Sequence, residues 1–457
     1  MKAQPRKRRM TKYVVAEACI ALALLVVCSR VSAQIVRTGL DAYGDWRTDA
    51  PGVMRKITAA DLPVPGETES TANRSRVIPK PAGAALKTMP GFQVEEFVTG
   101  MRGARVLRTA PNGDIFLALS RPEGKIMTIR TGPDMSNPKV ETFATGLREA
   151  YGIAFYPPGP APKWVYVGEF GKVVRFPYRN GDLTASGAPE TIVSDLATGG
   201  NHWTRDVAFS PDGKTMYVAV GSASNVAEQM GPPPADLAAF KKSHSQGSAW
   251  DREEWRANVL AYDPDGKNKR VFASGIRNCS GLALQPATGV VYCATNERDL
   301  FGDNLPPDYV TSVKEGAFYG WPWYYIGNHQ DTRPGGGRRP DLADKVSVPD
   351  VLIQPHSAPL GIAFDPGGQF PPDWKGDAFV ALHGSWNRAL RTGYKIVRLP
   401  FKDGKPTGQY QDLVVGFVAD DQNVWGRPVD VAFAKDGSLL FSDDGNGVVY
   451  RVAYKPE

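Results

Sequence analysis

The sequence predicts an all-β fold, a six-bladed β-propeller with an N-terminal arm and long loop insertions on the channel face. Three observations lead to this prediction. A short pattern of Gly, a polar or charged residue and a new apolar run recurs six times along the chain. Each copy is followed by a turn sequence and then by a second short apolar strand. Such self-similarity at a spacing of tens of residues is typical of repeat architectures, and no long helical period competes with it.

The six copies define six units of about four strands. The clearest copy spans 273–284 and contains Arg277 and Asn278. Second strands are predicted at 114–118, 164–167, 216–220, 290–294, 378–382 and 439–442. Third strands are visible at 173–176, 259–262, 396–399 and 448–452. These runs are rich in β-branched and aromatic residues, and radial closure of the units would hide their edges.

The chain before the first unit has two parts. Residues 34–90 are polar and rich in Pro and Gly, so we expect an extended arm lying against the propeller, with 67–75 as its least ordered part. Residues 92–98 form a strand that we expect to pair with the C-terminal strands and close the ring. The propeller domain is therefore expected over 91–457.

The first 33 residues have the features of a secretory signal peptide. A basic start precedes an apolar stretch at 14–28, and Val31-Ser32-Ala33 gives a small-residue cleavage pattern. The stretch is too short for a stable membrane span, so a periplasmic or secreted location is expected. Residues 1–33 hold seven Lys and Arg and one Glu, which account for the whole formal charge of +6. The nearly neutral remainder gives no support to a nucleic-acid partner.

Two cysteines outside this segment, Cys279 and Cys293, lie on the two strands of one predicted hairpin. In an oxidising compartment they can form a disulfide bond. The alternative is a pair of small buried thiols, and the sequence leaves both interpretations open.

Two long insertions interrupt the repeats, at 226–256 and at 300–350. The second contains an aromatic run at 318–325. Long loops on a rigid scaffold commonly carry specificity, so this run could form a stacking wall for a sugar ring. Packing of the insertion onto its blade is the alternative.

The topology of an up-and-down blade predicts which residues share one face. Links between blades, and links from the second to the third strand, lie opposite the hairpin turns, at one mouth of the channel. The links between blades carry Arg102, Arg148, His202, Arg277 with Asn278, His356 and Arg427. The links from second to third strands include 222–225, 296–299, 383–388 and 443–446. A ring of Arg and His suits a polyanionic ligand, although each Arg alone could form a salt bridge to a neighbouring blade.

The loop 296–299, with Asp303 shortly after it, offers clustered oxygen ligands. Such ligands suit a hard cation such as Ca²⁺, although the spacing is not that of an EF-hand. We therefore predict a calcium site in the region of Arg298, Asp299 and Asp303. A solvated acidic loop is the alternative.

Together these residues resemble the soluble pyrroloquinoline quinone (PQQ)-dependent sugar dehydrogenases, especially the sorbosone and glucose dehydrogenase branch. The resemblance covers about 92–454 and rests on 201–206, 275–278, 296–299 with 307–309, 318–322 and 384–388. It implies a six-bladed propeller that uses PQQ, a planar quinone with three carboxylates, together with Ca²⁺. It also implies a sugar or keto-aldehyde substrate, and an electron acceptor such as a membrane quinone or cytochrome c.

The resemblance also implies roles for single residues. His202 corresponds to the general base, and Arg277 would polarise the quinone carbonyl. The implied cofactor-binding residues are Arg277, Asn278, Arg388, Arg427 and Arg148. Three positions depart from the family. Ser222 stands where the family has an acid, and Val429 stands where it has a second arginine. The family's cofactor-binding lysine falls near Asn387 or Arg388, and we assign its role to Arg388.

The implied reaction is oxidation of an aldose or an aldehyde of the L-sorbosone type. His202, neutral at working pH, would remove a proton from the anomeric hydroxyl or from an aldehyde hydrate, and a hydride would pass to the quinone. Two alternatives belong to other classes: a calcium-dependent propeller lactonase and a non-catalytic carbohydrate-binding propeller. The abundance of Arg and His disfavours the lactonase, whose metal would be held by acidic and amide side chains.

Overall fold

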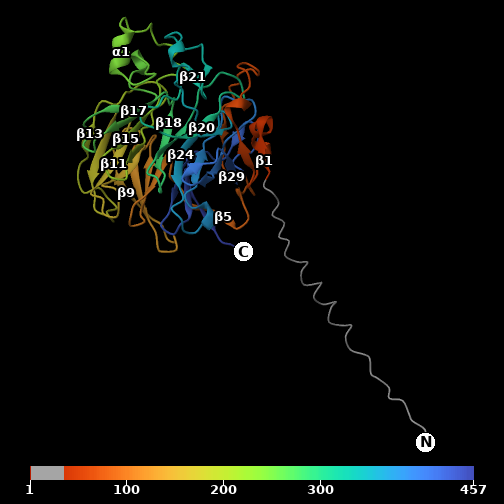
Figure 1. Cartoon of the computed structure of the whole chain (residues 1–457). Coiled ribbons are helices and arrows are strands. Elements are labelled where there is room, and N and C mark those ends of the chain that lie inside the picture. Colours follow the sequence, from red (N-terminus) through yellow and green to blue (C-terminus); the bar gives the residue numbers. More distant parts are fainter. Residues whose placement is uncertain (2–34, 457) are drawn as a thin grey trace. The chain divides into compact units, whose positions relative to one another are not determined.

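The computed structural model describes residue 1 and residues 35–456 (Figure 1). Apart from Met1, the predicted signal peptide lies outside the described residues. Val36–Glu457 forms one compact unit, whose regular secondary structure is mostly strand and whose described part contains one α-helix, α1 (Leu237–Ser243). No helix in the described part of the chain has the length and apolarity needed to cross a membrane.

Five four-stranded antiparallel sheets are built by up-and-down runs of strands. The first two are β6 (Ala104–Thr109), β7 (Ile115–Leu119), β8 (Lys125–Arg130) and β9 (Lys139–Ala144), then β10 (Ile153–Tyr156), β11 (Trp164–Glu169), β12 (Lys172–Pro177) and β13 (Glu190–Val193). The next two are β14 (Val207–Phe209), β15 (Met216–Val220), β16 (Asn258–Tyr262) and β17 (Arg270–Ser274), then β18 (Cys279–Leu284), β19 (Val291–Thr295), β20 (Asp308–Ser312) and β23 (Val351–Ile353). The fifth contains β31 (Pro428–Phe433), β32 (Leu439–Asp443), β33 (Val448–Tyr454) and β5 (Phe92–Val98).

The strands of the remaining repeat lie in a seven-stranded sheet. Its strands β24 (Pro359–Phe364), β25 (Ala378–Leu382), β26 (Lys395–Leu399) and β29 (Tyr410–Val415) follow the same order, and β1 (Val36–Thr38), β2 (Met54–Lys56) and β4 (Lys87–Thr88) extend it. The first strands of the six sheets contact one another in the cyclic order β6, β10, β14, β18, β24, β31 and back to β6. The predicted propeller arrangement is therefore confirmed, but the predicted number of six blades is wrong: five blades are found, because strands of the N-terminal segment merge the remaining repeat into a seven-stranded sheet.

The ring closes where the strand before the first repeat meets the C-terminal strand. β5 pairs antiparallel with β33, so that Phe92 faces Tyr454 and Glu96 faces Tyr450. This pairing confirms the predicted closure. It fixes the two ends of the repeat region in one sheet, which leaves no free edge there.

The core lies between neighbouring sheets. Every residue of β7, β19 and β25 is buried, because a blade strand has another sheet packed against each of its faces. Aromatic rings fill these layers: the ring of Phe116 lies 5.1 Å from that of Phe143 in its own sheet and 5.1 Å from that of Phe155 in the next. The apolar runs of the repeats are thus the layers of the core.

One buried ion triad ties the first strands together. Arg108 of β6 pairs with Asp430 of β31 at 2.8 Å and with Asp206 next to β14 at 2.8 Å. Asp430 also accepts the N–H of Leu107, and Asp206 that of Leu282 in β18. Because breaking such a triad costs about 3–5 kcal/mol, it fixes the spacing of four sheets.

The N-terminal segment, 35–90, is bound to the last two sheets. β2 and β4 both pair with β29, and β3 (Arg76–Val77) pairs with β30 (Asn423–Val424). A buried charge cluster joins the segment to the large sheet as well, since Arg55 meets Asp412 at 2.9 Å and Lys395 meets Asp49 at 2.7 Å. The short 3₁₀-helices η1 (Gly39–Tyr43), η2 (Trp46–Thr48) and η3 (Ala59–Asp61) lie in this segment.

The two insertions pack against each other. Their buried residues form one apolar cluster with Trp250, Phe318, Trp321, Trp323 and Tyr324, each at most 3% exposed. Figure 1 shows α1 of the first insertion close to β21 (Tyr324–Tyr325) of the second. The structure therefore supports the packing alternative for the aromatic run. Short elements complete the fold: η4 (Asp251–Glu253), β22 (His329–Gln330), η5 (Pro340–Leu342), η6 (Pro372–Trp374), β27 (Phe401–Lys402) and β28 (Lys405–Pro406).

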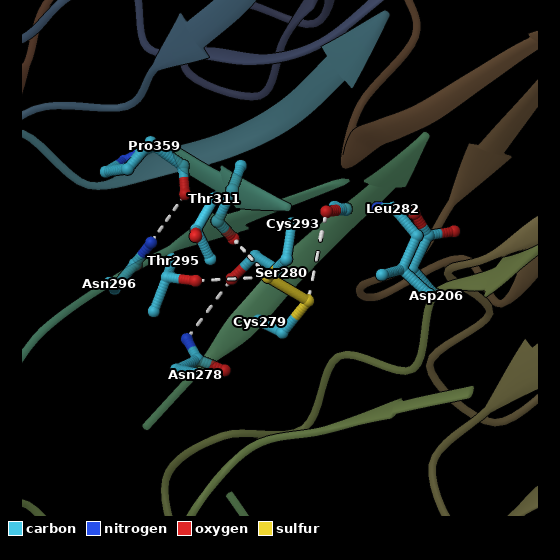
Figure 2. The surroundings of a disulfide bond; sticks show 12 residues. Asp206, Asn278, Cys279, Ser280, Leu282, Cys293, Thr295, Asn296, Thr311 and Pro359 are labelled. Atoms are coloured by element: carbon cyan, nitrogen blue, oxygen red, sulfur yellow. Dashed lines mark hydrogen bonds between the residues drawn. A yellow bond between two sulfur atoms is a disulfide. The ribbon is translucent and has the colours of Figure 1, made fainter. Parts of the chain in front are cut away.

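A disulfide bond joins Cys279 of β18 to Cys293 of β19, with Cα atoms 5.7 Å apart (Figure 2). Of the two interpretations left open by the sequence, the structure contains the disulfide. Cys279 directly follows Asn278, so the cross-link anchors the strand that begins at the site described next.

Candidate functional site

A cavity of about 530 Å³ lies where the links between strands converge; we call it the link cavity. Its walls come from the links that precede β14, β18, β24 and β31, and from the links that follow β15, β19 and β25. Five of the predicted residues line it: His202, Arg277, Asn278, Asp299 and Arg427. The predicted convergence is therefore found for four of the six sheets.

His202 has one ring nitrogen committed to the protein. Its Nδ1 lies 2.8 Å from the carbonyl oxygen of Ser222 and 3.0 Å from the Ser222 hydroxyl, which itself donates to Ser224. Because a carbonyl only accepts, Nδ1 carries the hydrogen and Nε2 keeps its lone pair. Nε2 has no hydrogen-bond partner within the described residues. Burial, helped by the charge of Arg277, lowers the pKa of His202 to about 3, so the imidazole is neutral.

Arg277 is held firmly beside His202. Its guanidinium donates to the carbonyl oxygens of Asn225 (3.0 Å) and Glu297 (2.7 Å), and it pairs with the Asp299 carboxylate at 3.2 Å. Burial would raise the pKa of Asp299, but its hydrogen bond from His356 and the charge of Arg277 outweigh burial and lower it. The positive charge of Arg277 is therefore fixed in place and compensated.

Arg427 has a different kind of partner. It donates to Nδ1 of His383 at 3.0 Å, and Nε2 of His383 donates to Asp444 at 2.9 Å. Asp444 also pairs with Arg105 at 2.8 Å. Burial, and then the charge of Arg427, lower the pKa of His383 to about 4, so this imidazole is neutral as well. Arg427 has no carboxylate partner in the part of the chain that the structure describes.

Asn278 lines the cavity, and Gly221 makes room for the side chains of Asn278 and His202. Asn278 donates to Ser280 at 3.2 Å, and its Oδ1 is buried without a hydrogen-bond partner among the described residues (Figure 2). A Cβ atom at Gly221 would collide with Asn278 and with His202, so only glycine allows both side chains to sit here.

Two further acids line the cavity. Asp308 accepts the N–H groups of Glu297 (2.7 Å) and Ala358 (2.8 Å), and burial raises its pKa to about 7. Glu297 accepts from Arg298, whereas its other carboxylate oxygen is buried with no partner in the described chain. The cavity therefore combines neutral imidazoles, guanidinium groups and partly protonated acid.

Two predicted cofactor-binding arginines do not line the cavity. Arg388 is buried and donates to the carbonyl oxygen of Tyr43 (2.7 Å) and to Asn304 (2.8 Å), so it holds the N-terminal segment. Arg148 is exposed, and its guanidinium lies 4.9 Å from the centre of the Phe170 ring. The link topology brought their backbones to this face, but their side chains found partners elsewhere.

The predicted calcium residues do not meet around one point. Arg298 is fully buried between Glu297 (2.8 Å) and Asp331 (3.1 Å), and Asp303 accepts the N–H of Ala389. Only Asp299 lines the cavity, where Arg277 engages its carboxylate. No group of three or more His, Cys, Asp or Glu side chains suited to a metal ion occurs among residues 35–456.

Arg74, His383, Trp386 and Asp308 are among the lining residues that were not predicted site residues. His383 and Trp386 belong to the predicted link 383–388, so the repeat topology could have identified them. Arg74 comes from the N-terminal segment, and no local pattern in the sequence connects it with this face.

Comparison with known proteins gives a family match, two relatives and a solved structure with the same fold. The chain matches the family model described as TrAA12-like over residues 86–307 and 341–455. An uncharacterized protein of Borreliella burgdorferi is 27% identical over 383 residues, 81% of this chain and 92% of that protein. The pyrroloquinoline quinone-dependent pyranose dehydrogenase of Coprinopsis cinerea is 32% identical over 122 residues, 23% of this chain but only 16% of that enzyme. The solved holo form of the pyranose dehydrogenase PQQ domain of the same organism has the same fold, with a TM-score of 0.64 and 21% identity over 82% of this chain and 98% of that domain.

Proposed function

The chain belongs to the TrAA12-like family, and on that premise we propose that it is a PQQ-dependent sugar dehydrogenase acting on an aldose or a keto-aldehyde. The observation that carries the proposal is the link cavity, where a neutral His202 with a free Nε2 lies among arginines. The names of the Coprinopsis cinerea relative and of its PQQ domain support the cofactor and the sugar class.

The residues of the cavity fit a flat tricarboxylate. Its volume of about 530 Å³ lies in the range of small-molecule sites. Arg74 and Arg427 lack a carboxylate partner in the described chain, and Arg427 Nε is a buried donor without a hydrogen-bond partner there. Asn278 Oδ1 is a buried unpaired acceptor, which suits an N–H or O–H group of a ligand rather than a carboxylate. Buried polar atoms of this kind are expected where a ligand completes their hydrogen bonds.

We assign these roles to the chain's own residues. His202 Nε2 removes the proton from the anomeric hydroxyl or from the hydroxyl of an aldehyde hydrate, while Ser222 keeps the ring in the required tautomer. Arg277 stabilises the negative charge that develops on the substrate oxygen. Arg427 and Asn278 hold the cofactor. When bound, the quinone supplies the acceptor for the hydride.

Reconstitution tests the proposal. The mature chain is incubated with PQQ, with and without Ca²⁺, and bleaching of an artificial electron acceptor is followed with aldoses, keto-aldehydes and sugar lactones. Quinone-dependent turnover of a sugar or keto-aldehyde is expected. Hydrolysis of a lactone without quinone, or sugar binding without any turnover, would contradict the proposal and favour the lactonase or the binding propeller.

Calcium, location and electron acceptor are finer parts of the same proposal. Glu297, Asp299 and Asp308 line the cavity, but no group of three such side chains suited to a metal ion occurs in the described chain, so we assign no Ca²⁺ ligands. Reconstitution with and without Ca²⁺ tests whether turnover needs the ion. The disulfide bond supports a periplasmic or secreted location, which cell fractionation tests. Reduction of cytochrome c or of a membrane quinone by the reconstituted enzyme tests the acceptor.

A further inference from the structure

Arg74 brings a positive charge to the link cavity from a segment that precedes the family match. That match begins at residue 86, yet Arg74 lines the cavity together with Trp386. The Arg74 guanidinium lies 5.3 Å from the centre of the Trp386 ring, and Trp386 is 39% exposed. One wall of the site is therefore built by the chain's own N-terminal segment and an exposed aromatic ring.

Hydrogen bonds immediately before Arg74 hold its backbone at the rim. The N–H of Asn73 donates to the carbonyl oxygen of Trp386 at 2.7 Å, and its side-chain amide donates to Ala389 at 2.8 Å. Arg391, which is fully buried, donates to the carbonyl oxygen of Asn73 at 2.9 Å. The backbone that leads into Arg74 is therefore fixed at the rim, whereas the Arg74 side chain is exposed and rests on the Trp386 ring.

The segment is also fixed farther from Arg74. Ser70 and Thr68 accept the N–H groups of Gly302 (3.0 Å) and Asp303 (2.8 Å) through their hydroxyl groups. On the other side, β3 pairs with β30 directly after Arg74. The part of the sequence that we expected to be least ordered is thus bonded to the loops at 302–303 and 386–391, and the strand that follows it pairs with β30.

The charge of Arg74 lacks a carboxylate partner among the described residues. Of the arginines that line the cavity, Arg277 forms an ion pair with Asp299 at 3.2 Å. The Arg74 guanidinium lies over the Trp386 ring instead. A guanidinium over an aromatic face keeps the N–H donors at its edge available. Two parallel donors of this kind match a carboxylate better than a hydroxyl group.

We propose that Arg74 binds a carboxylate group in the link cavity, with Trp386 supporting the guanidinium. The source of that carboxylate rests on the proposed function: it belongs either to the PQQ cofactor or to an acidic sugar, such as a uronic acid, as substrate. In both cases the N-terminal segment is part of the binding site.

Calorimetric titration of the full mature chain tests this inference with three carboxylate probes: PQQ, glucuronate and the redox-inactive benzene-1,3,5-tricarboxylate. We expect Arg74→Gln to weaken the binding of at least one probe about tenfold, and Arg74→Lys to weaken it less. Arg76→Gln is the matched control, because Arg76 lies on the same segment, is exposed and bonds to Asn423 outside the cavity. Thermal melting checks that each variant is folded.

The pattern of losses identifies the source of the carboxylate. Weaker PQQ binding, with an unchanged kcat/KM ratio of glucuronate to glucose, assigns the cofactor. A changed ratio with unchanged PQQ binding assigns the substrate. If Arg74→Gln binds every probe and keeps the ratio as the unmodified chain does, the inference is wrong. If benzene-1,3,5-tricarboxylate binding depends on Arg74 but PQQ gives no turnover, the proposed function fails while this inference stands.

Discussion

The two sides of the link cavity hold their arginines in different ways. Arg277 makes five hydrogen bonds and is paired with the Asp299 carboxylate. Arg427 donates instead to His383, a neutral imidazole. The charge of Arg277 is therefore compensated inside the protein, whereas that of Arg427 remains available to a ligand. The number of arginines at a channel mouth thus says less about anion binding than the partner of each one.

The hydrogen-bond partners also distinguish two of the histidines that line the cavity, His202 and His383. His202 uses Nδ1 to bond Ser222 and leaves Nε2 toward the cavity, which suits a base. His383 uses both nitrogens, one toward Arg427 and one toward Asp444, which suits a positioning residue. Two histidines in one cavity therefore differ in role because their hydrogen-bond partners fix opposite tautomers.

The largest expected effect comes from substituting His202 and His383 one at a time. His202→Ala should lower kcat about 10³-fold while PQQ affinity is retained, since a general base contributes about 10²–10⁴-fold. His383→Gln should lower kcat about tenfold at most, because His383 only orients Arg427. Steady-state kinetics with calorimetric PQQ titration measures both effects, and His244→Gln, outside the cavity, is the control. Equal losses of kcat in the His202 and His383 variants would contradict the assignment.

The second largest effect distinguishes Arg427, which we expect to affect cofactor affinity, from Arg277, which we expect to affect stability. Arg427→Gln should weaken PQQ binding about 10- to 100-fold with little change in stability, because it removes a charge-assisted bond to a ligand. Arg277→Gln should instead lower the free energy of unfolding by about 3 kcal/mol, because it leaves Asp299 buried without its cation. Chemical denaturation and PQQ titration distinguish the two outcomes, with the exposed Arg102→Gln as control. A stability loss in the Arg427 variant alone would reverse the comparison.

A smaller effect should follow when Arg277, like Arg427, is left without a carboxylate partner. Asp299→Asn removes the carboxylate that compensates Arg277, so affinity for benzene-1,3,5-tricarboxylate should rise about three- to tenfold at low ionic strength. Added salt should reduce the gain, since screening weakens the freed charge. Asp212→Asn, in an exposed turn, is the matched control. An unchanged or lower affinity would show that Arg277 does not act on the ligand's charge.

The smallest effect concerns protonation. Nitrogen NMR of the five histidines should show His202 with hydrogen on Nδ1 and His383 with hydrogen on Nε2, and neither should titrate between pH 5 and 8. Their folded pKa values, about 3 and about 4, lie below the unfolded value of about 6.5, so the unfolded chain binds protons first as the pH falls. Their stabilising contribution is complete above pH 6.5 and is lost toward pH 3–4. Titration of either imidazole near pH 6.5 would contradict this.

Much of the site could be predicted because it follows from strand order. His202, Arg277, Asn278 and Arg427 occupy the same place in three of the repeats, just before a first strand, and such positions share one face of a ring of sheets. Arg388 and Arg298 could not be placed in this way. Each lies in a longer link, where a flexible side chain can turn toward any carbonyl or carboxylate. Arg388 donates to the carbonyl oxygen of Tyr43 away from the cavity, and Arg298 is buried between Asp331 and the cavity-lining Glu297.

The sequence by itself determined the strands, the closure of β5 on β33 and the face that carries His202, because these depend on local apolar periodicity and on turn residues. Only the tertiary structure decided which arginine is compensated, that Cys279 and Cys293 are bonded, and that Arg74 reaches the cavity. The physical reason is distance along the chain: contacts of about 3 Å between residues from separate sheets or from the N-terminal segment exist only after all the sheets have packed. Local pattern sets the elements, and packing sets the chemistry between them.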